Sequence, residues 1–240
     1  MPQEITANTA PPAHGPMELT STERRILGVL IEKGMTTPEQ YPLTMNALVN
    51  GCNQKSNRDP ITNYDELQVD ASLQLLIKKG LVINATGSSG RVDRFSSQMG
   101  KFFELRSVEI AIIGELLLRG PQTEGELRIR ASRMREIEDL PALHELLTKL
   151  QTATPPFVKR LTPEGVSRGV RYTHTFYTYN EMRRVLTEEA NRAPAESYDD
   201  GGSAAEPAPV RASEGDALRA RIIALEERVA ALERRLPADM

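Results

Sequence analysis

Apolar residues recur at helical spacing in the first predicted element, which begins after Thr20. Positions three and four apart lie side by side on a helix, so the pattern predicts one apolar face. That face comprises Ile26, Leu27, Leu30 and Ile31. Thr20 is placed to cap the helix, and Glu23 completes a capping box three residues later. Gly34 predicts the end of the helix, because glycine adopts the left-handed conformation at low cost.

A second apolar pattern lies within residues 37–60, which carry prolines near both ends. It predicts a helix of about three turns, with Thr44 as its cap. The apolar positions are Leu43, Ala47, Leu48 and Val49. The helix runs into residues 52–58 (CNQKSNR), which hold little apolar carbon and many hydrogen-bond donors. This polar run is therefore the first candidate for binding.

Residues 64–79 predict a third helix, which Gly80 ends. Its expected apolar face comprises Leu67, Val69, Leu73, Leu76 and Ile77. Residues 81–83 and 91–95 then read as strands on either side of a glycine-rich turn, so they predict a hairpin. Three helices followed by a hairpin is the element order of a winged helix.

The same pattern recurs in the second half of the chain, with gaps that fall in loops. Residues 23–37 align with 109–123, Thr44–Leu48 with Thr123–Leu127, and Val69–Leu76 with Leu143–Leu150. Residues 157–161 and 170–176 predict a second hairpin. The first unit carries an insertion near residues 38–44, in which Tyr41 is expected to be a packing anchor. We therefore predict an internal duplication that places two copies of one fold in tandem.

Beyond the second unit, residues 191–213 are rich in Pro, Gly, Ala and acidic residues and predict a flexible acidic linker. Residues 214–236 then show apolar positions at alternating intervals of four and three, which is a heptad pattern. β-Branched residues at one core position and Leu at the other favour a parallel two-stranded coiled coil. In that pairing Arg221 would face Glu226 of the second chain. The predicted dimer seam comprises Leu218, Ile222, Leu225, Val229, Leu232 and Leu236.

These elements together predict a mainly α chain with small β-hairpins, in the α+β class. The predicted order is a disordered tail (1–17), winged-helix domains at 18–104 and 105–190, the linker (191–213), a coiled-coil helix (214–236) and a short tail (237–240).

The distribution of charge is only weak support for nucleic-acid binding. The formal net charge of the chain is −3. Residues 18–180 carry 21 Lys and Arg against 19 Asp and Glu, a net of +2, so the flanking segments are acidic. A dedicated nucleic-acid binder usually has a clear basic excess.

Composition excludes several classes of site. Cys52 is the only cysteine, so the chain can form no internal disulfide and no cysteine-based metal site; it is expected to be a small core residue. The longest apolar run, in residues 110–118, is interrupted by Glu115 and is too short to span a membrane. The opening residues lack a signal peptide's apolar segment, so a cytoplasmic protein is the simplest interpretation. No phosphate loop or nucleophile motif is found, and we predict neither enzymatic activity nor a cofactor or metal.

Several short segments are more specific than the periodic pattern. They are residues 36–43 (TTPEQYPL), 52–55 (CNQK), 57–58 (NR), 116–120 (LLLRG), 122–123 (QT) and 125–128 (GELR). In these segments the chain resembles the YceH family of uncharacterised bacterial proteins, over residues 19–176 and the C-terminal helix. The resemblance implies a tandem winged helix and assigns no activity.

Basic and donor-rich residues outside the third helices form the candidate DNA interface. Both third helices begin near acidic runs, at 65–70 and 136–139, which would repel phosphate in the usual docking mode. Phosphate contacts would then come from loops and wings, with Asn53, Gln54 and Asn57 available to base edges. The predicted nucleic-acid-binding residues are Asn53, Gln54, Lys55, Asn57, Arg58, Arg91, Arg94, Arg128, Arg130, Arg133, Arg168 and Arg171.

Two classes of function stay open at this point. The first is a dimeric, regulator-like module that binds double-stranded DNA, which the fold, the seam and the wing arginines favour. The second is a winged-helix adaptor that contacts protein partners without touching nucleic acid, which the acidic third helices favour. The arginines can equally form a solvated face, and residues 53–58 can be a structural loop whose side chains satisfy backbone groups.

Overall fold

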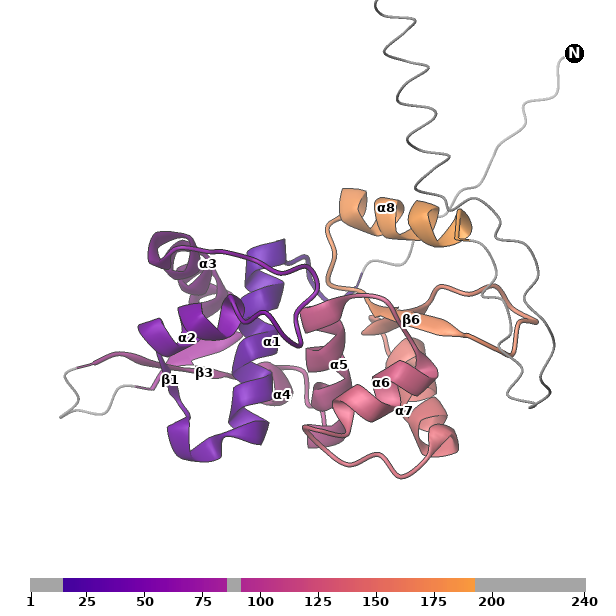
Figure 1. Ribbon diagram of the computed structural model, residues 1–240, viewed down its shortest axis with the longest axis horizontal. Helices are drawn as coiled ribbons and strands as arrows, with labels where there is room; N and C mark the ends of the chain where they lie inside the picture. Colours follow the sequence, from indigo (N-terminus) through magenta and orange to yellow (C-terminus); the bar gives the residue numbers. More distant parts are fainter. Residues whose placement is uncertain (1–14, 86–91, 193–240) are drawn as a thin grey trace, which may run out of the picture. The chain divides into compact units, whose positions relative to one another are not determined.

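A helical layer and a three-stranded antiparallel sheet form the first half of the protein, shown in Figure 1. The computed structural model describes residues 15–85 and 92–192. The elements are α1 (Ser21–Thr36), the 3-10 turn η1 (Pro38–Gln40), β1 (Leu43–Thr44), α2 (Met45–Cys52), α3 (Glu66–Lys78), β2 (Val82–Asn84) and β3 (Arg94–Ser97). The strand order is β1-β3-β2, so Phe95 in the central strand pairs with Leu43 on one side and Asn84 on the other.

The second half repeats this order of elements. It comprises α5 (Ser107–Arg119), β4 (Gln122–Thr123), α6 (Glu124–Ala131), α7 (Leu140–Thr152), β5 (Val158–Arg160) and β6 (Arg171–His174). Its sheet has the order β4-β6-β5, which is the counterpart of the first. Helices α5, α6 and α7 begin 86, 79 and 74 residues after α1, α2 and α3, in line with the alignment found in the sequence.

The predicted helix starts are confirmed by their caps. The Thr20 hydroxyl accepts from the backbone N–H of Glu23 at 3.2 Å, and the Glu23 carboxylate accepts from the Thr20 N–H at 2.7 Å. The Thr44 hydroxyl caps α2 by accepting from the Ala47 N–H, and Thr123 with Glu126 forms a capping box on α6 that was not predicted. Both satisfy N–H groups that have no partner within the helix.

Two sequence expectations about helix length are wrong. Helix α1 continues past Gly34 to Thr36, and α2 spans eight residues, about two turns. A Cβ at Gly34 would lie 3.2 Å from the ring of Tyr41, so this glycine makes room for the ring instead of ending the helix. The Tyr41 hydroxyl in turn accepts from the Ser97 N–H at 2.7 Å, which agrees with the packing role expected for Tyr41.

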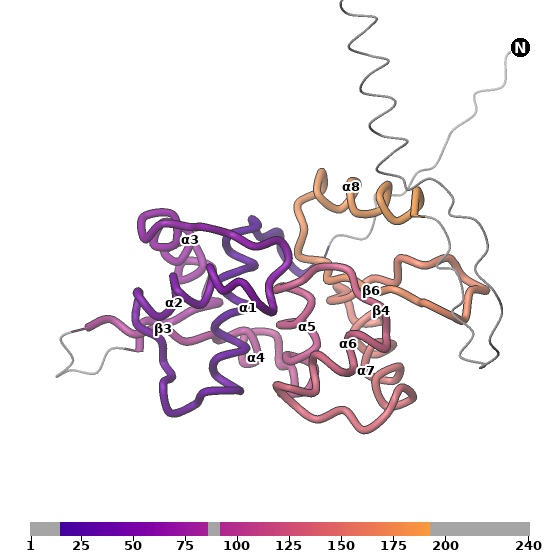
Figure 2. The backbone as a smooth tube through the Cα atoms, viewed as in Figure 1, coloured from indigo at the N-terminus to yellow at the C-terminus, as the bar shows by residue number. Residues whose placement is uncertain are grey.

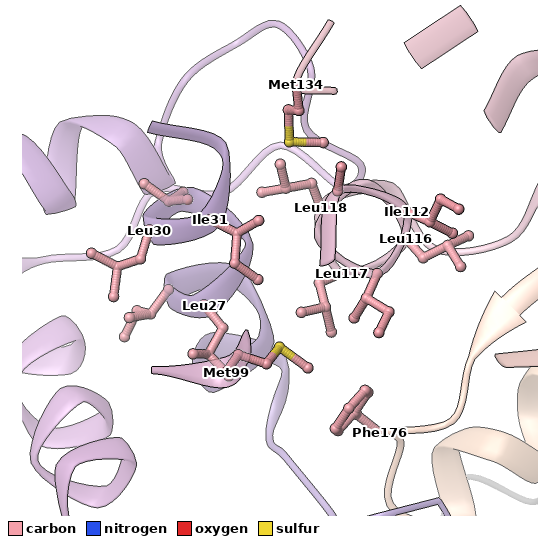
Figure 3. Close-up of a cluster of buried hydrophobic side chains, with 14 of the residues drawn as sticks. Leu27, Leu30, Ile31, Met99, Ile112, Leu116, Leu117, Leu118, Met134 and Phe176 are labelled. Atoms are coloured by element: carbon pink, nitrogen blue, oxygen red, sulfur yellow. The ribbon is translucent and has the colours of Figure 1, made fainter. Parts of the chain in front are cut away.

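The two halves meet where α1 lies along α5, the most extensive helix–helix contact in the described chain (Figure 2). Ile31 points from α1 towards α5, where Leu117 and Leu118 lie (Figure 3). Both halves share one continuous hydrophobic core and form a single compact unit.

Two helices were not anticipated from the sequence. The short α4 (Met99–Phe102) joins the halves, and α8 (Tyr179–Ala190) follows the second sheet. Helix α8 begins at a capping box of Thr178 and Glu181, and its apolar residues recur at helical spacing, although only Met182 is buried. Glu181 also forms a bidentate ion pair with Arg24 of α1, with N–O distances of 2.7 and 2.9 Å.

Several predictions fall on segments that the structure does not describe. They concern residues 1–14 of the N-terminal tail, Arg91 at the first wing, most of the acidic linker, and the heptad helix with its seam, Leu218 to Leu236. Within residues 15–85 and 92–192, no helix is both long and apolar enough to cross a bilayer.

Candidate functional site

The polar run after α2 forms a tightly bonded loop. The side chain of Asn53 donates to the Tyr64 carbonyl and accepts from the Tyr64 N–H, both at 2.8 Å. The Thr62 hydroxyl donates to the carbonyl of Cys52 at 3.0 Å. The Asn53 amide therefore holds the two ends of the loop together and has its main hydrogen-bonding groups engaged.

Arg58 is a buried structural residue. It is 6% exposed, and its guanidinium pairs with the Glu32 carboxylate at 2.6 Å. It also donates to the Gly51 carbonyl at 2.9 Å and to the Gln54 side chain at 3.0 Å. Arg58 and Gln54 thus belong to a polar network beneath the loop, where a DNA phosphate or base could not reach the guanidinium.

The same loop braces the first half against the second. Asn57 has a φ of 59°, and its side-chain oxygen accepts from Arg119 of α5 at 2.6 Å. The Asp59 N–H donates to the Leu118 carbonyl at 3.0 Å. Lys55 is exposed, and its ammonium group forms no ion pair or side-chain hydrogen bond within residues 15–85 and 92–192.

Of the arginines around α6, Arg128 and Arg130 are engaged locally. Arg128 donates to the carbonyls of Ile137 and Glu138 at 3.3 and 3.1 Å, which supports the loop before α7. Arg130 donates to the Glu126 carboxylate at 3.0 Å, one turn earlier on the same helix. Arg128 is thus held by backbone carbonyls and Arg130 by an acid, so neither guanidinium is wholly available to a phosphate.

Arg133 reaches into the protein towards a buried carboxylate. It donates to Glu115 of α5 at 3.2 Å, and Arg119 lies 3.1 Å from the other oxygen of Glu115. Burial raises the pKa of Glu115, although the two arginines act in the opposite direction. The acid that interrupts the apolar run of α5 therefore binds cations from two segments.

The wing arginines are only partly available. Arg94 donates to the Pro42 carbonyl at 3.0 Å. Arg171 donates to the Pro121 carbonyl at 2.9 Å and lies 3.1 Å from Glu189 of α8. Arg168, between β5 and β6, is exposed and forms no ion pair in the described segments. Most of the predicted DNA residues within 15–85 and 92–192 are therefore engaged in contacts inside the protein, and Lys55 and Arg168 are exposed cations among them without an ion pair in that part of the chain.

An exposed apolar stripe on α3 is the surface feature that sequence reasoning missed. Leu67 is 81% exposed and Leu75 is 46% exposed, with the exposed Ala71 between them. The prediction that Leu67 faces the core is wrong. The buried face consists of Val69, Leu73 and Leu76. The spacing of four and three between those residues excludes Leu67, which lies on the opposite side of the helix.

Acidic residues border this stripe at the start of α3. Asp65 caps the helix through a 2.8 Å bond from the Gln68 N–H, and Glu66 follows it, exposed. Asp70 accepts from Gln74 at 3.1 Å on the neighbouring face. The stripe is therefore apolar along its length and bordered by acid at its N-terminal end. Figure 1 shows where α3 lies in the first half.

The surroundings of Cys52 are those of a buried structural residue. Cys52 is buried, and burial raises the pKa of its thiol to about 12, so the thiol stays protonated near neutral pH. Within the described ranges, no group of three or more His, Cys, Asp and Glu side chains is arranged to hold a metal ion.

His174 on β6 is buried, and it gives the stability of the protein a pH dependence. Its Nδ1 accepts from the Phe176 N–H at 3.2 Å, and its ring lies 3.9 Å from the ring of Tyr177. Burial, together with the nearby Arg24, lowers the pKa of His174 well below its ordinary value.

We expect acid to destabilise the protein through this histidine. The unfolded chain protonates His174 near pH 6.5 while the folded chain does not, so stability falls as the pH drops below that value. The loss is up to about 1.4 kcal/mol per pH unit. His174→Asn keeps an acceptor for Phe176 and should flatten the urea-unfolding free energy between about pH 6.5 and 5. The exposed His144→Asn should keep the slope; an equal slope in both variants would contradict the assignment.

Comparisons with known proteins identify relatives along most of the chain. A family model described as "Protein of unknown function, DUF480" matches residues 19–166. A UPF0502 protein of Aeromonas hydrophila is 42% identical over 215 residues, covering 88% of this chain and 96% of that protein. A UPF0502 protein of Shewanella pealeana is 40% identical over 225 residues, covering 92% and 97%. The UPF0502 protein YceH of Escherichia fergusonii is 41% identical over 225 residues, covering 91% and 94%.

Proposed function

The chain belongs to the bacterial DUF480/UPF0502 family, and from that premise we propose that it is a protein-binding adaptor built from two winged-helix units. Each half has three helices, and a hairpin whose central strand also pairs with a short strand before the second helix. This arrangement supports the winged-helix assignment. In such a unit the third helix is the usual docking element.

The observation that carries the adaptor proposal is the apolar stripe Leu67, Ala71 and Leu75 on the outer side of α3. Phosphate backbones offer nothing apolar to such a stripe, whereas an amphipathic helix buries its own apolar face against it. Burial of the two leucines against a protein partner would contribute favourable binding free energy, which contact with DNA would not provide. The third helix is thus better suited to a protein than to a DNA groove.

The charge around the stripe specifies the chemistry of the partner. Glu66 and Asp70 lie beside it and would repel phosphate, but they would attract Lys or Arg on a partner helix. We propose as partner an amphipathic protein helix with one apolar face and basic residues along its border.

Site-specific photocrosslinking in bacterial cells tests this proposal. A photoreactive residue at Ala71 should yield an adduct, and its matched control is Glu145, the exposed equivalent position on α7. The crosslinked peptide should carry apolar residues at helical spacing with Lys or Arg beside them. Adding Leu67→Asp should reduce the adduct at least about tenfold without unfolding the protein, because this side chain is 81% exposed. Absence of an adduct, equal adducts at both positions, or an adduct to a second copy would overturn the proposal.

DNA binding remains the second candidate, favoured by the exposed cations Lys55 and Arg168. It predicts that a mixed-sequence duplex is retained at low salt, with a log–log slope of about −0.9 per phosphate contact as salt rises. Lys55→Glu and Arg168→Glu should then each weaken retention. The adaptor proposal predicts no retention at micromolar protein.

We further propose self-association through the heptad seam that runs from Leu218 to Leu236. The residues lie outside the described part, so the proposal rests on their spacing. A chain ending at Asn191 should sediment as a monomer while the full chain sediments as a dimer; the same oligomeric state for both would rule out the seam.

A further inference from the structure

A cavity of about 260 Å³ lies at the junction of the two halves. Its wall combines residues of α1, the loop after Arg58, the end of α5 and the chain after β6. Apolar surface comes from Pro60, Leu117 and Pro121. This volume lies just below the usual range for ligand sites, about 300–1,000 Å³, which restricts the cavity to a compact molecule.

Three guanidinium groups line this cavity, and only one carboxylate, that of Asp59, lines it with them. Arg24 is satisfied by its bidentate pair with Glu181 and by the Leu19 carbonyl. Arg119 is bonded to Asn57 and lies near Glu115, as described above. The remaining cation, Arg25, has no ion pair within the described chain.

Arg25 is 3% exposed and has only backbone carbonyls as partners. Its two terminal nitrogens donate to the carbonyls of Cys52 and Pro60, at 3.3 and 2.5 Å. Its Nε is buried and makes no hydrogen bond. A buried cation is costly unless an opposite charge and full hydrogen bonding compensate it, and here, among the described residues, the charge has no ion pair and the Nε hydrogen has no acceptor. Burial and the nearby Arg58 accordingly lower the pKa of Arg25.

We propose that this cavity binds a small organic anion, whose charge offsets that of Arg25 and whose compact apolar body lies against Pro60 and Leu117. A carboxylate and a phosphate share the chemistry that Arg25 requires, because each offers a charged oxygen acceptor. The apolar part of the wall favours an anion that carries carbon over a bare inorganic one. The wall comes from both halves, so the bound anion would stabilise their packing and act as an effector of the whole unit. This inference does not depend on what α3 binds.

Calorimetric titration of the full chain with two probes tests the site. Benzoate represents an apolar carboxylate and inorganic phosphate a bare phosphate, each against sodium chloride at equal ionic strength. We expect saturable binding of one benzoate per chain and a raised melting temperature. If only phosphate binds saturably, the claim that the ligand has an apolar body is wrong. If neither probe gives heat or a melting shift beyond that of chloride, the proposed site is wrong.

Variants locate the binding. Arg25→Gln should weaken benzoate binding at least about tenfold, since it removes the buried charge. Ser21→Phe fills the cavity from an exposed position on α1 and keeps the test decisive if Arg25→Gln fails to fold. Arg135→Gln, at an exposed arginine outside the cavity wall, should bind as the natural chain does. Unchanged affinity in Ser21→Phe would place the anion elsewhere and refute the proposal.

Discussion

Replacing Arg58 by alanine is expected to lower the free energy of unfolding by about 3–5 kcal/mol. The substitution leaves the Glu32 carboxylate without its partner, and the side chains of this pair are 0% and 6% exposed. It also removes the donor to the Gly51 carbonyl beneath the polar loop. Urea denaturation followed by circular dichroism measures the change.

A control and a rescue separate this effect from a general loss of charge. Arg135→Ala removes an exposed arginine and should change stability by at most about 0.5 kcal/mol. The double substitution Arg58→Met with Glu32→Leu should recover most of the loss, because an apolar pair replaces a buried ion pair at little cost. If Arg58→Ala left stability intact but weakened DNA retention, the structural role assigned to Arg58 would be wrong.

The second large effect is expected at the contact between α1 and α5. A Cβ at Gly114 would meet Ile31 Cγ2 at 2.6 Å, and one at Gly28 would meet Leu118 Cγ at 2.7 Å. Gly114→Val should therefore lower the free energy of unfolding by about 1–3 kcal/mol, as overpacking does. Helix propensity alone predicts that the substitution raises the free energy of unfolding, because valine is a better helix former than glycine. Thermal and urea unfolding give the sign directly.

Gly125 on α6 provides the matched control. A Cβ there meets nothing within 4 Å, so Gly125→Ala should keep or slightly raise stability, by up to about 1 kcal/mol. Should Gly114→Val prove as stable as the natural chain, α1 and α5 would not pack as closely as described.

Local chemistry explains why the helix starts could be predicted. A threonine followed three residues later by glutamate satisfies the first N–H groups within one turn, whatever the rest of the chain does. Thr20 with Glu23 was predicted in this way, and Thr123 with Glu126 follows the same rule in the structure. The duplication was also predictable, because the apolar residues of the second half repeat the spacing found in the first half.

Features that depend on a distant partner were not predictable in the same way. Glycine often ends a helix, yet Gly34 lies within α1, where it leaves room for the ring of Tyr41. In the sequence Arg58 resembles a surface cation, but in the structure it pairs with Glu32, which lies 26 residues earlier in the chain. Helix α8 was missed for a different reason, because its sequence does carry local signals: Thr178 and Glu181 form a capping box, and Tyr179, Met182 and Leu186 recur at helical spacing.

Leu67 is the residue for which the error matters most to function. A list of apolar residues places it in the core, whereas the geometry of α3 assigns the core to Val69, Leu73 and Leu76. The candidate site changes accordingly, from a set of arginines to an exposed apolar stripe.

By itself, the sequence determined the order of the three helices and the hairpin in each half, the caps at Thr20 and Thr44 and the repeated plan, because these depend on hydrogen bonds and periodicity within a few residues. Only the tertiary structure decided which charges are buried, which leucines are exposed, and that Gly28 and Gly114 bring the two halves together. Burial and pairing depend on segments far apart in the chain, and a linear pattern does not encode which of them will meet.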